Sequence, residues 1–285
     1  MGTRPLRQYL SDYPQIDVAD DLQALVVPWR RHRRRFAERL GALTEAQWAM
    51  ASRCDAWSVR DVVCHLVTTD AFWLASLAAA ASGTPSTYLV DFDPSTSPES
   101  FVAPMRALAD DEVLARFRDG TDAFVDAVEG LDADVWAQRG ESPMGHVPVR
   151  LVVGHAFWDS WLHERDVFVE LGRALPVEPD ELAAVTWYAL VAGSLQGGLI
   201  DDPAPVGPGL TEPLDVTLGF DDLPDDPLRL RTDQGVRLER GGGDATSVGA
   251  ALDMVESLTG RRQGWSADRL PPALADHLRR AFQIL

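Results

Sequence analysis

Four long segments in the first 200 residues repeat apolar side chains every three or four positions, and this spacing most constrains the fold. They span residues 20–43, 58–83, 98–131 and 148–171. Such spacing places the apolar side chains on one stripe of a helix. Polar connectors separate the segments, and 46% hydrophobic content is enough for a large core. The pattern predicts a four-helix bundle.

The ends of these segments carry helix signals. Ser58 is a candidate N-cap with Asp61 three residues on, and Gly83 follows the same segment. Pro148 suits the start of the last segment, and Gly172 follows its end. These signals predict that the second helix begins at Ser58 and that the fourth runs from Pro148 to Leu171.

The composition changes after a fifth predicted helix at residues 180–199. A stretch rich in proline and glycine covers residues 201–213, and the alternating segments LDVTLGF, LRLRTD and VRLERG that follow are typical of strands. Two further helical segments end the chain. The sequence therefore predicts a mainly α protein: a helical bundle over residues 1–200, with an N-terminal extension at 1–19, and a small α+β domain over residues 201–285.

The charge and the cysteine content limit the partners and the location. The net charge is −18, from 44 acidic residues and 26 basic ones that are all arginine, so a nucleic-acid partner is not expected. Cys54 and Cys64 are too few for a disulfide framework. The first residues do not resemble a signal peptide, and the longest apolar run is short of a membrane span. A cytoplasmic protein without a membrane partner is expected.

The fourth helical segment places ionisable side chains on an otherwise apolar helix. His155, Asp159 and His163 follow one another at spacings of four, so each lies one turn from the next. Adjacent members of such a stripe can chelate a divalent cation, but His155 and His163 are about 12 Å apart along the axis, so only one pair can do so. His65, on the inward face of the second helix, is the best third ligand.

The same pattern also fits purely structural roles for these side chains. A buried histidine such as His65 can be a hydrogen-bonded core residue. Asp159 and His163 can be a solvated surface pair with a salt bridge to Arg165. His32, in a run of arginines, His146, in a loop, and His277, in the tail, are poorer ligand candidates.

Two motifs carry a resemblance to a known family. RCDAWSVRDVVCHL (residues 53–66) and HAFWDSWLHERDVFVELGRAL (residues 155–175) are similar to the two signatures of the mycothiol-dependent maleylpyruvate isomerase family, within the DinB-like superfamily of metal-binding bundles. The resemblance covers about residues 20–200, and the strand-rich tail is similar to the smaller C-terminal domain of many members.

The resemblance implies one divalent metal held by His65, Asp159 and His163. Zinc is expected first, and nickel, iron or manganese also suit such ligands. It implies mycothiol as a co-substrate, whose thiolate attacks a small electrophile in an isomerase or S-transferase reaction. His155 and Trp158 are expected to line the cofactor pocket, although packing in the core is the favoured alternative for Trp158. The resemblance does not assign a catalytic residue beyond the metal ligands.

Several alternatives stay open at this point. The same scaffold also fits a metal-dependent hydrolase or a non-catalytic metal- or ligand-binding protein. The tail arginines Arg229, Arg231, Arg237 and Arg240 can clamp a substrate carboxylate or simply carry strand-face charges. The lysine-free composition is typical of an actinobacterial genome, which fits mycothiol, and the chain is expected to be a monomer or a homodimer.

Overall fold

The computed structural model describes residues 16–19, 23–93, 96–200, 214–231, 236–241, 244–263, 265, 268, 270, 272, 274 and 275. The chain divides into two compact units, one of residues 23–177 and the other of residues 1–22 with 178–285. The predicted boundary near residue 200 differs from this division, because the helix at 179–200 groups with the sheet of the second unit. The predicted boundary stretch 201–213 and His277 lie outside the described residues.

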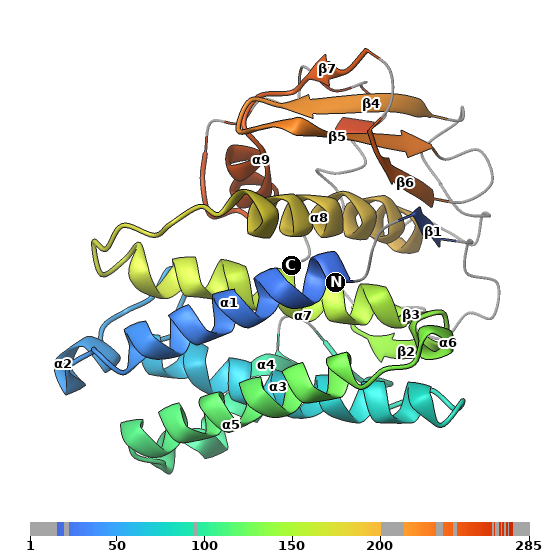
Figure 1. The fold of residues 1–285 in the computed structure, drawn as a ribbon. Helices are drawn as coiled ribbons and strands as arrows, with labels where there is room; N and C mark the ends of the chain where they lie inside the picture. The colour runs from blue at the N-terminus through green and yellow to red at the C-terminus, as the bar shows by residue number, and fades with distance from the viewer. Residues whose placement is uncertain are drawn as a thin grey trace. The chain divides into compact units, whose positions relative to one another are not determined.

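Four long helices form the first unit: α1 (Gln23–Leu40), α3 (Val59–Ala81), α5 (Asp110–Glu129) and α7 (Val149–Phe168). Helix α3 contacts α5 and α7, and α1 contacts the same two helices, so the four pack as a bundle (Figure 1). The predicted four-helix bundle is confirmed. Its core buries the aromatic side chains of Trp29, Phe36, Phe117, Phe124, Phe157 and Phe168.

Helix α3 begins where the sequence predicts. The Ser58 hydroxyl accepts a hydrogen bond from the Asp61 backbone N–H (3.2 Å), and the Asp61 carboxylate accepts one from the Ser58 N–H (3.0 Å). This capping box satisfies two backbone donors that a helix start leaves open. By length and composition alone α3 could cross a membrane, a property that core helices of bundles share. The cap fixes the register of every later side chain on α3.

The third predicted helix is wrong as one continuous element. Residues 98–131 form α4 (Ser97–Val102), a 3-10 turn η1 (Ala103–Ala107) and α5. Pro104 in the turn cannot donate a backbone hydrogen bond and disfavours a continuous α-helix. Leu108 and Ala109 are extended, and three acidic residues then begin α5, as suits a helix N-terminus.

Shorter elements complete this unit. Helix α2 (Glu45–Trp48) and helix α6 (Ala133–Trp136) are single turns within connectors. The connector before α7 folds as an antiparallel hairpin of β2 (Arg139–Ser142) and β3 (Gly145–Pro148), where the sequence predicts only a break. The buried carboxylate of Glu141 on β2 accepts hydrogen bonds from the backbone N–H groups of Tyr88 and Leu89. The hairpin therefore fixes the loop that follows α3.

The second unit is a small α+β structure. Strands β1 (Ile16–Ala19), β4 (Asp215–Phe220), β5 (Leu223–Arg231), β6 (Val236–Arg240) and β7 (Thr246–Ser247) form a sheet of order β1-β6-β5-β4-β7. Strand β5 is antiparallel to β4 and to β6, whereas β1 is parallel to β6. Helix α8 (Pro179–Ile200) contacts α9 (Ala251–Leu258), β5 and β6. The predicted strands at β4, β5 and β6 are confirmed, and the parallel N-terminal strand was not predicted.

Candidate metal centre

Two neighbouring helices of the bundle bring His65, Asp159 and His163 together. His65 lies on α3, two turns after its cap, and the other two lie one turn apart on α7. The Nε2 atom of His65 is 3.6 Å from Oδ2 of Asp159, and Nε2 of His163 is 3.3 Å from Oδ1 of the same carboxylate. The two imidazole rings meet edge to face, with their centroids 5.0 Å apart. The candidate ligand atoms all lie within 4.8 Å of one another.

These three side chains fit a divalent cation. Two imidazole nitrogens and one carboxylate oxygen are a common ligand set of catalytic zinc. Two such ligands bound to one tetrahedral zinc lie about 3.3 Å apart, because each is about 2.0 to 2.1 Å from the metal. The 3.3 Å and 3.6 Å separations are close to that value. Oδ2 of Asp159 is buried and makes no hydrogen bond among the described residues, because Nε2 of His65 lies just beyond hydrogen-bond distance at 3.6 Å.

Asp159 and His163 each shift the pKa of the other. Burial raises the pKa of Asp159, but the attraction of His163 and the close contacts with both histidines outweigh it and hold that pKa well below its usual value. Burial lowers the pKa of His163, but the attraction of Asp159, together with the neighbouring Cys54 and Asp166, outweighs it and holds that pKa well above the usual value. The pair is therefore a carboxylate and an imidazolium, and a cation that binds here must displace a proton from His163.

A solvated surface pair does not match the surroundings of Asp159 and His163. The side chain of His163 is 8% exposed and that of Asp159 is 17% exposed. The guanidinium of Arg165 stacks on the Trp161 ring, 4.7 Å from its centroid. The ring of Trp57 packs against His65, with 5.2 Å between centroids. The three candidate ligands thus lie in a largely enclosed place on the bundle.

His155 lies one turn before the candidate ligand Asp159, Trp158 directly precedes Asp159, and both belong to an aromatic cluster. The His155 ring centroid is 5.0 Å from that of Trp73 and 5.7 Å from that of Trp158. His155 is 6% exposed and Trp158 is 4% exposed. Their predicted contact with a cofactor stays a prediction.

The burial of His155 should make the free energy of unfolding depend on pH. Burial lowers the pKa of His155 to about 4, so the folded protein keeps this ring neutral where the unfolded chain protonates it. The free energy of unfolding of the metal-free protein should therefore fall as the pH is lowered from about 6.5 to about 4, with about 3 kcal/mol from His155. Urea unfolding between pH 7 and pH 4 measures it. His155→Phe should show a shallower fall, and an identical fall in both proteins would contradict the assignment.

The remaining sequence candidates have structural contacts. His32 is buried, 3.0 Å from the Ser160 hydroxyl, and Nε2 of His146 is 2.7 Å from the Ser86 carbonyl oxygen. Cys64 is buried in the core, and burial raises the pKa of its thiol to about 11. Each of these side chains therefore has a structural contact of its own, outside the His65, Asp159 and His163 cluster.

All four tail arginines form ion pairs on the sheet of the second unit, three of them across strands and Arg237 with Glu239 on its own strand. Arg229 binds both carboxylate oxygens of Asp215, at 2.7 Å each. Arg231 pairs with Glu239, and Arg240 pairs with Asp226. These cross-strand contacts favour the interpretation of the arginines as strand-face charges.

Sequence reasoning missed two residues beside His163. The Asp166 carboxylate lies 2.9 Å from Nδ1 of His163, and the Cys54 thiol donates a hydrogen bond to Asp166 (3.2 Å). Asp166 is three residues after His163 on the same helix, a spacing that puts the two side chains on one face. That spacing was a usable signal, whereas the approach of Cys54, 109 residues away, was not visible in the sequence.

The fold and the site together describe a helical-bundle protein with a candidate metal centre, built from His65, Asp159 and His163 on two of its helices. Residues 29–168 match the family described as the mycothiol maleylpyruvate isomerase N-terminal domain, and the chain belongs to this family of enzymes. The resemblance seen in the two motifs is thereby confirmed.

Solved structures agree with this family in fold. A crystal structure of the mycothiol-dependent maleylpyruvate isomerase matches with a TM-score of 0.58 and 14% sequence identity, over 85% of this chain and 90% of the other. A histidine-to-alanine mutant of that enzyme matches with a TM-score of 0.59, the same identity and the same coverage. No curated protein matches the sequence. At this identity the structural matches show a shared fold, including a mainly helical architecture with a small sheet.

Proposed function

We propose that this protein is a metal-dependent enzyme that uses mycothiol to act on a small electrophilic substrate. The observation that carries the proposal is the convergence of His65, Asp159 and His163, whose candidate ligand atoms all lie within 4.8 Å of one another around the Asp159 carboxylate. Family membership supports the use of a thiol and an isomerase-type reaction. The geometry supports a divalent cation, zinc in the first place, at the three side chains.

The protein side chains hold and orient the cation. His65 comes from α3, and Asp159 and His163 come from α7, so the site depends on the packing of these two helices. Three protein ligands leave a coordination position open, which is typical of catalytic rather than structural sites. A cation there would lower the pKa of a thiol and favour the thiolate, the nucleophilic form. The enclosed surroundings of the site limit its contact with water, which strengthens these electrostatic effects.

The reaction follows from the chemistry of a thiolate. Its sulfur forms a bond to an electrophilic carbon of a conjugated double bond, and the π electrons of that bond move onto the conjugated acceptor group, so the former double bond can rotate. The electron pair returns to re-form the double bond when the thiolate leaves, or the adduct takes up a proton when the thiolate stays. If the same carbon–sulfur bond breaks after rotation within the adduct, the thiol is regenerated and the net reaction is an isomerisation. If the bond persists, the product is a thioether and the reaction is a transfer. His155, one turn before Asp159 on α7, and Trp158, which directly precedes Asp159, are the side chains we propose to contact the thiol cofactor.

Thermal unfolding tests this function. Mycothiol at about 100 times its dissociation constant should raise the melting temperature of the zinc-loaded protein by about 5 to 10 °C, because it binds only the folded state. The metal-free protein should show no such rise, and mycothiol with a methylated thiol should stabilise the loaded protein much less. Equal stabilisation with and without zinc, or none in either, would contradict the proposal. Recovery of free thiol after turnover would distinguish isomerisation from transfer.

A further inference from the structure

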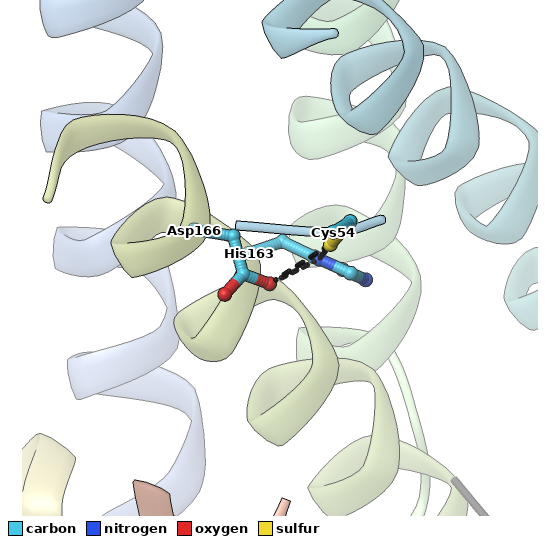
Figure 2. Close-up of side chains that lie close together, drawn as sticks. All are labelled: Cys54, His163 and Asp166. Atoms are coloured by element: carbon cyan, nitrogen blue, oxygen red, sulfur yellow. Dashed lines mark hydrogen bonds and ion pairs between the residues drawn. The ribbon is translucent and has the colours of Figure 1, made fainter. Parts of the chain in front are cut away.

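The two ring nitrogens of His163 face different partners. Nε2 points to the carboxylate of Asp159, at 3.3 Å. Nδ1 points to Asp166, at 2.9 Å, and the sulfur of Cys54 lies 3.6 Å from the same nitrogen (Figure 2). The ring therefore belongs to two groups of candidate ligands, one with His65 and Asp159 and one with Cys54 and Asp166. Only one of the two ring nitrogens of His163 can bind a given cation.

The distances distinguish the two groups. Nitrogen and oxygen ligands on one tetrahedral zinc lie about 3.3 Å apart. The Nδ1 to Asp166 distance of 2.9 Å is shorter than this and is that of a direct hydrogen bond. The Nε2 to Asp159 distance of 3.3 Å fits a shared cation. The Asp159 side therefore suits the metal, and the Asp166 side suits a hydrogen bond.

The surroundings of Asp166 support this division. Its side chain is fully buried, and its Oδ2 atom also accepts the hydrogen bond from the Cys54 thiol. The Nε atom of Arg53 lies 3.9 Å from Oδ1, and the Arg53 backbone N–H donates to the Asp166 carbonyl oxygen (3.1 Å). These contacts tie the segment before α3 to α7 and hold the carboxylate in place against Nδ1.

We propose that Asp166 is a positioning residue that holds the His163 ring through Nδ1–H and so presents Nε2 to the cation, with Cys54 acting as a donor to Asp166 and not as a ligand. The inference rests on the proposed metal site. A carboxylate that accepts the second N–H of a ligating histidine fixes its tautomer and orientation and makes the ligating nitrogen more basic. Loss of the Asp166 charge should therefore weaken metal binding without removing a ligand.

Zinc competition measures this effect. Asp166→Asn should bind zinc about 10- to 100-fold more weakly than the wild type, at unchanged stoichiometry. Glu164→Gln is the matched control, because Glu164 directly follows His163 on α7, is buried, and pairs with Arg35 and His32 away from the site. Both variants lose a buried carboxylate, so a purely structural effect would lower the affinity in both. Equal zinc affinity of Asp166→Asn and wild type would overturn the inference.

Cobalt-substituted protein tests the role of Cys54. Without added thiol, the wild type and Cys54→Ser should show the same cobalt spectrum, with no sulfur-to-cobalt charge-transfer band. A band in the wild type that disappears in Cys54→Ser would show that Cys54 is a ligand and would overturn the inference.

Nitrogen NMR of the zinc-loaded wild type, with its histidines isotopically labelled, tests the inference without any variant. Its result does not depend on whether Asp166→Asn folds. His163 should carry its proton on Nδ1, and a proton on Nε2 would overturn the inference even if Asp166→Asn failed to fold. A wild type that binds no zinc would instead contradict the proposed function, so the two failures can be told apart.

Discussion

His163→Ala should reduce the metal content of the purified protein from about one divalent ion per chain to nearly none. The substitution removes a nitrogen that the ion pair with Asp159 and the hydrogen bond to Asp166 hold in one orientation. His65→Ala should have the same effect, because it removes the candidate ligand that α3 contributes to the cluster. Elemental analysis of protein purified without chelator measures the result.

His146→Ala is the control for this prediction. His146 also has a fixed side chain, with Nε2 2.7 Å from the Ser86 carbonyl oxygen, but it lies in the hairpin and not in the cluster. It should keep the metal content of the wild type. Unchanged metal content in both His65→Ala and His163→Ala would show that the cluster is not the metal site.

Arg33→Met should lower the free energy of unfolding by about 3 to 5 kcal/mol. Arg33 is fully buried in the bundle and pairs with Asp70 of α3. It also donates hydrogen bonds to Thr121 of α5 (3.0 Å) and Ser160 of α7 (3.1 Å). The side chain thus joins all four long helices, and its loss leaves the Asp70 carboxyl buried without its charged partner.

The pKa of Asp70 shows that burial strongly disfavours a charged carboxylate at this position. Burial raises that pKa to about 6 even though Arg33 lies beside it. Replacing both residues, as in Arg33→Met with Asp70→Leu, should therefore recover part of the lost stability, because no unpaired charge remains. Urea unfolding of the single and double variants measures both effects.

An exposed arginine provides the comparison. Arg116 pairs with Glu112 one turn away on α5, and its side chain is 51% exposed. Arg116→Met should change the free energy of unfolding by less than about 0.5 kcal/mol, because solvent screens such a pair. If Arg33→Met cost no more than this, the buried pair would not hold the bundle together.

Local sequence signals predicted much of the helical unit. Apolar spacing identified the regions of α1, α3 and α7, and the Ser58 cap identified the start of α3, because these features depend on residues within one or two turns. The break between η1 and α5 was missed because apolar residues continue at helical spacing through Pro104 and Leu108. The hairpin before α7 was missed because its stability depends on distant partners, such as the loop N–H groups that donate to Glu141.

The candidate site divides in the same way. Asp159 and His163 lie one helical turn apart, so their spacing predicted a pair. His65 required knowledge of which helices touch, and the sequence suggested it only through its apolar surroundings and the family resemblance. Cys54 lies in the turn before α3, and no local sequence pattern predicts that this turn brings it close to His163. Spacing therefore predicted the pair of Asp159 and His163 but not Asp166 on the same helix, and helix packing determined which other side chains lie beside the pair.

The measurement that tests the metal- and thiol-dependent function most directly is a titration of cobalt-substituted protein with mycothiol. We expect a sulfur-to-cobalt charge-transfer band to grow with added mycothiol to one equivalent per chain, and to be absent with the methylated thiol. A cobalt spectrum that stays unchanged at saturating mycothiol would contradict the function proposed for this site.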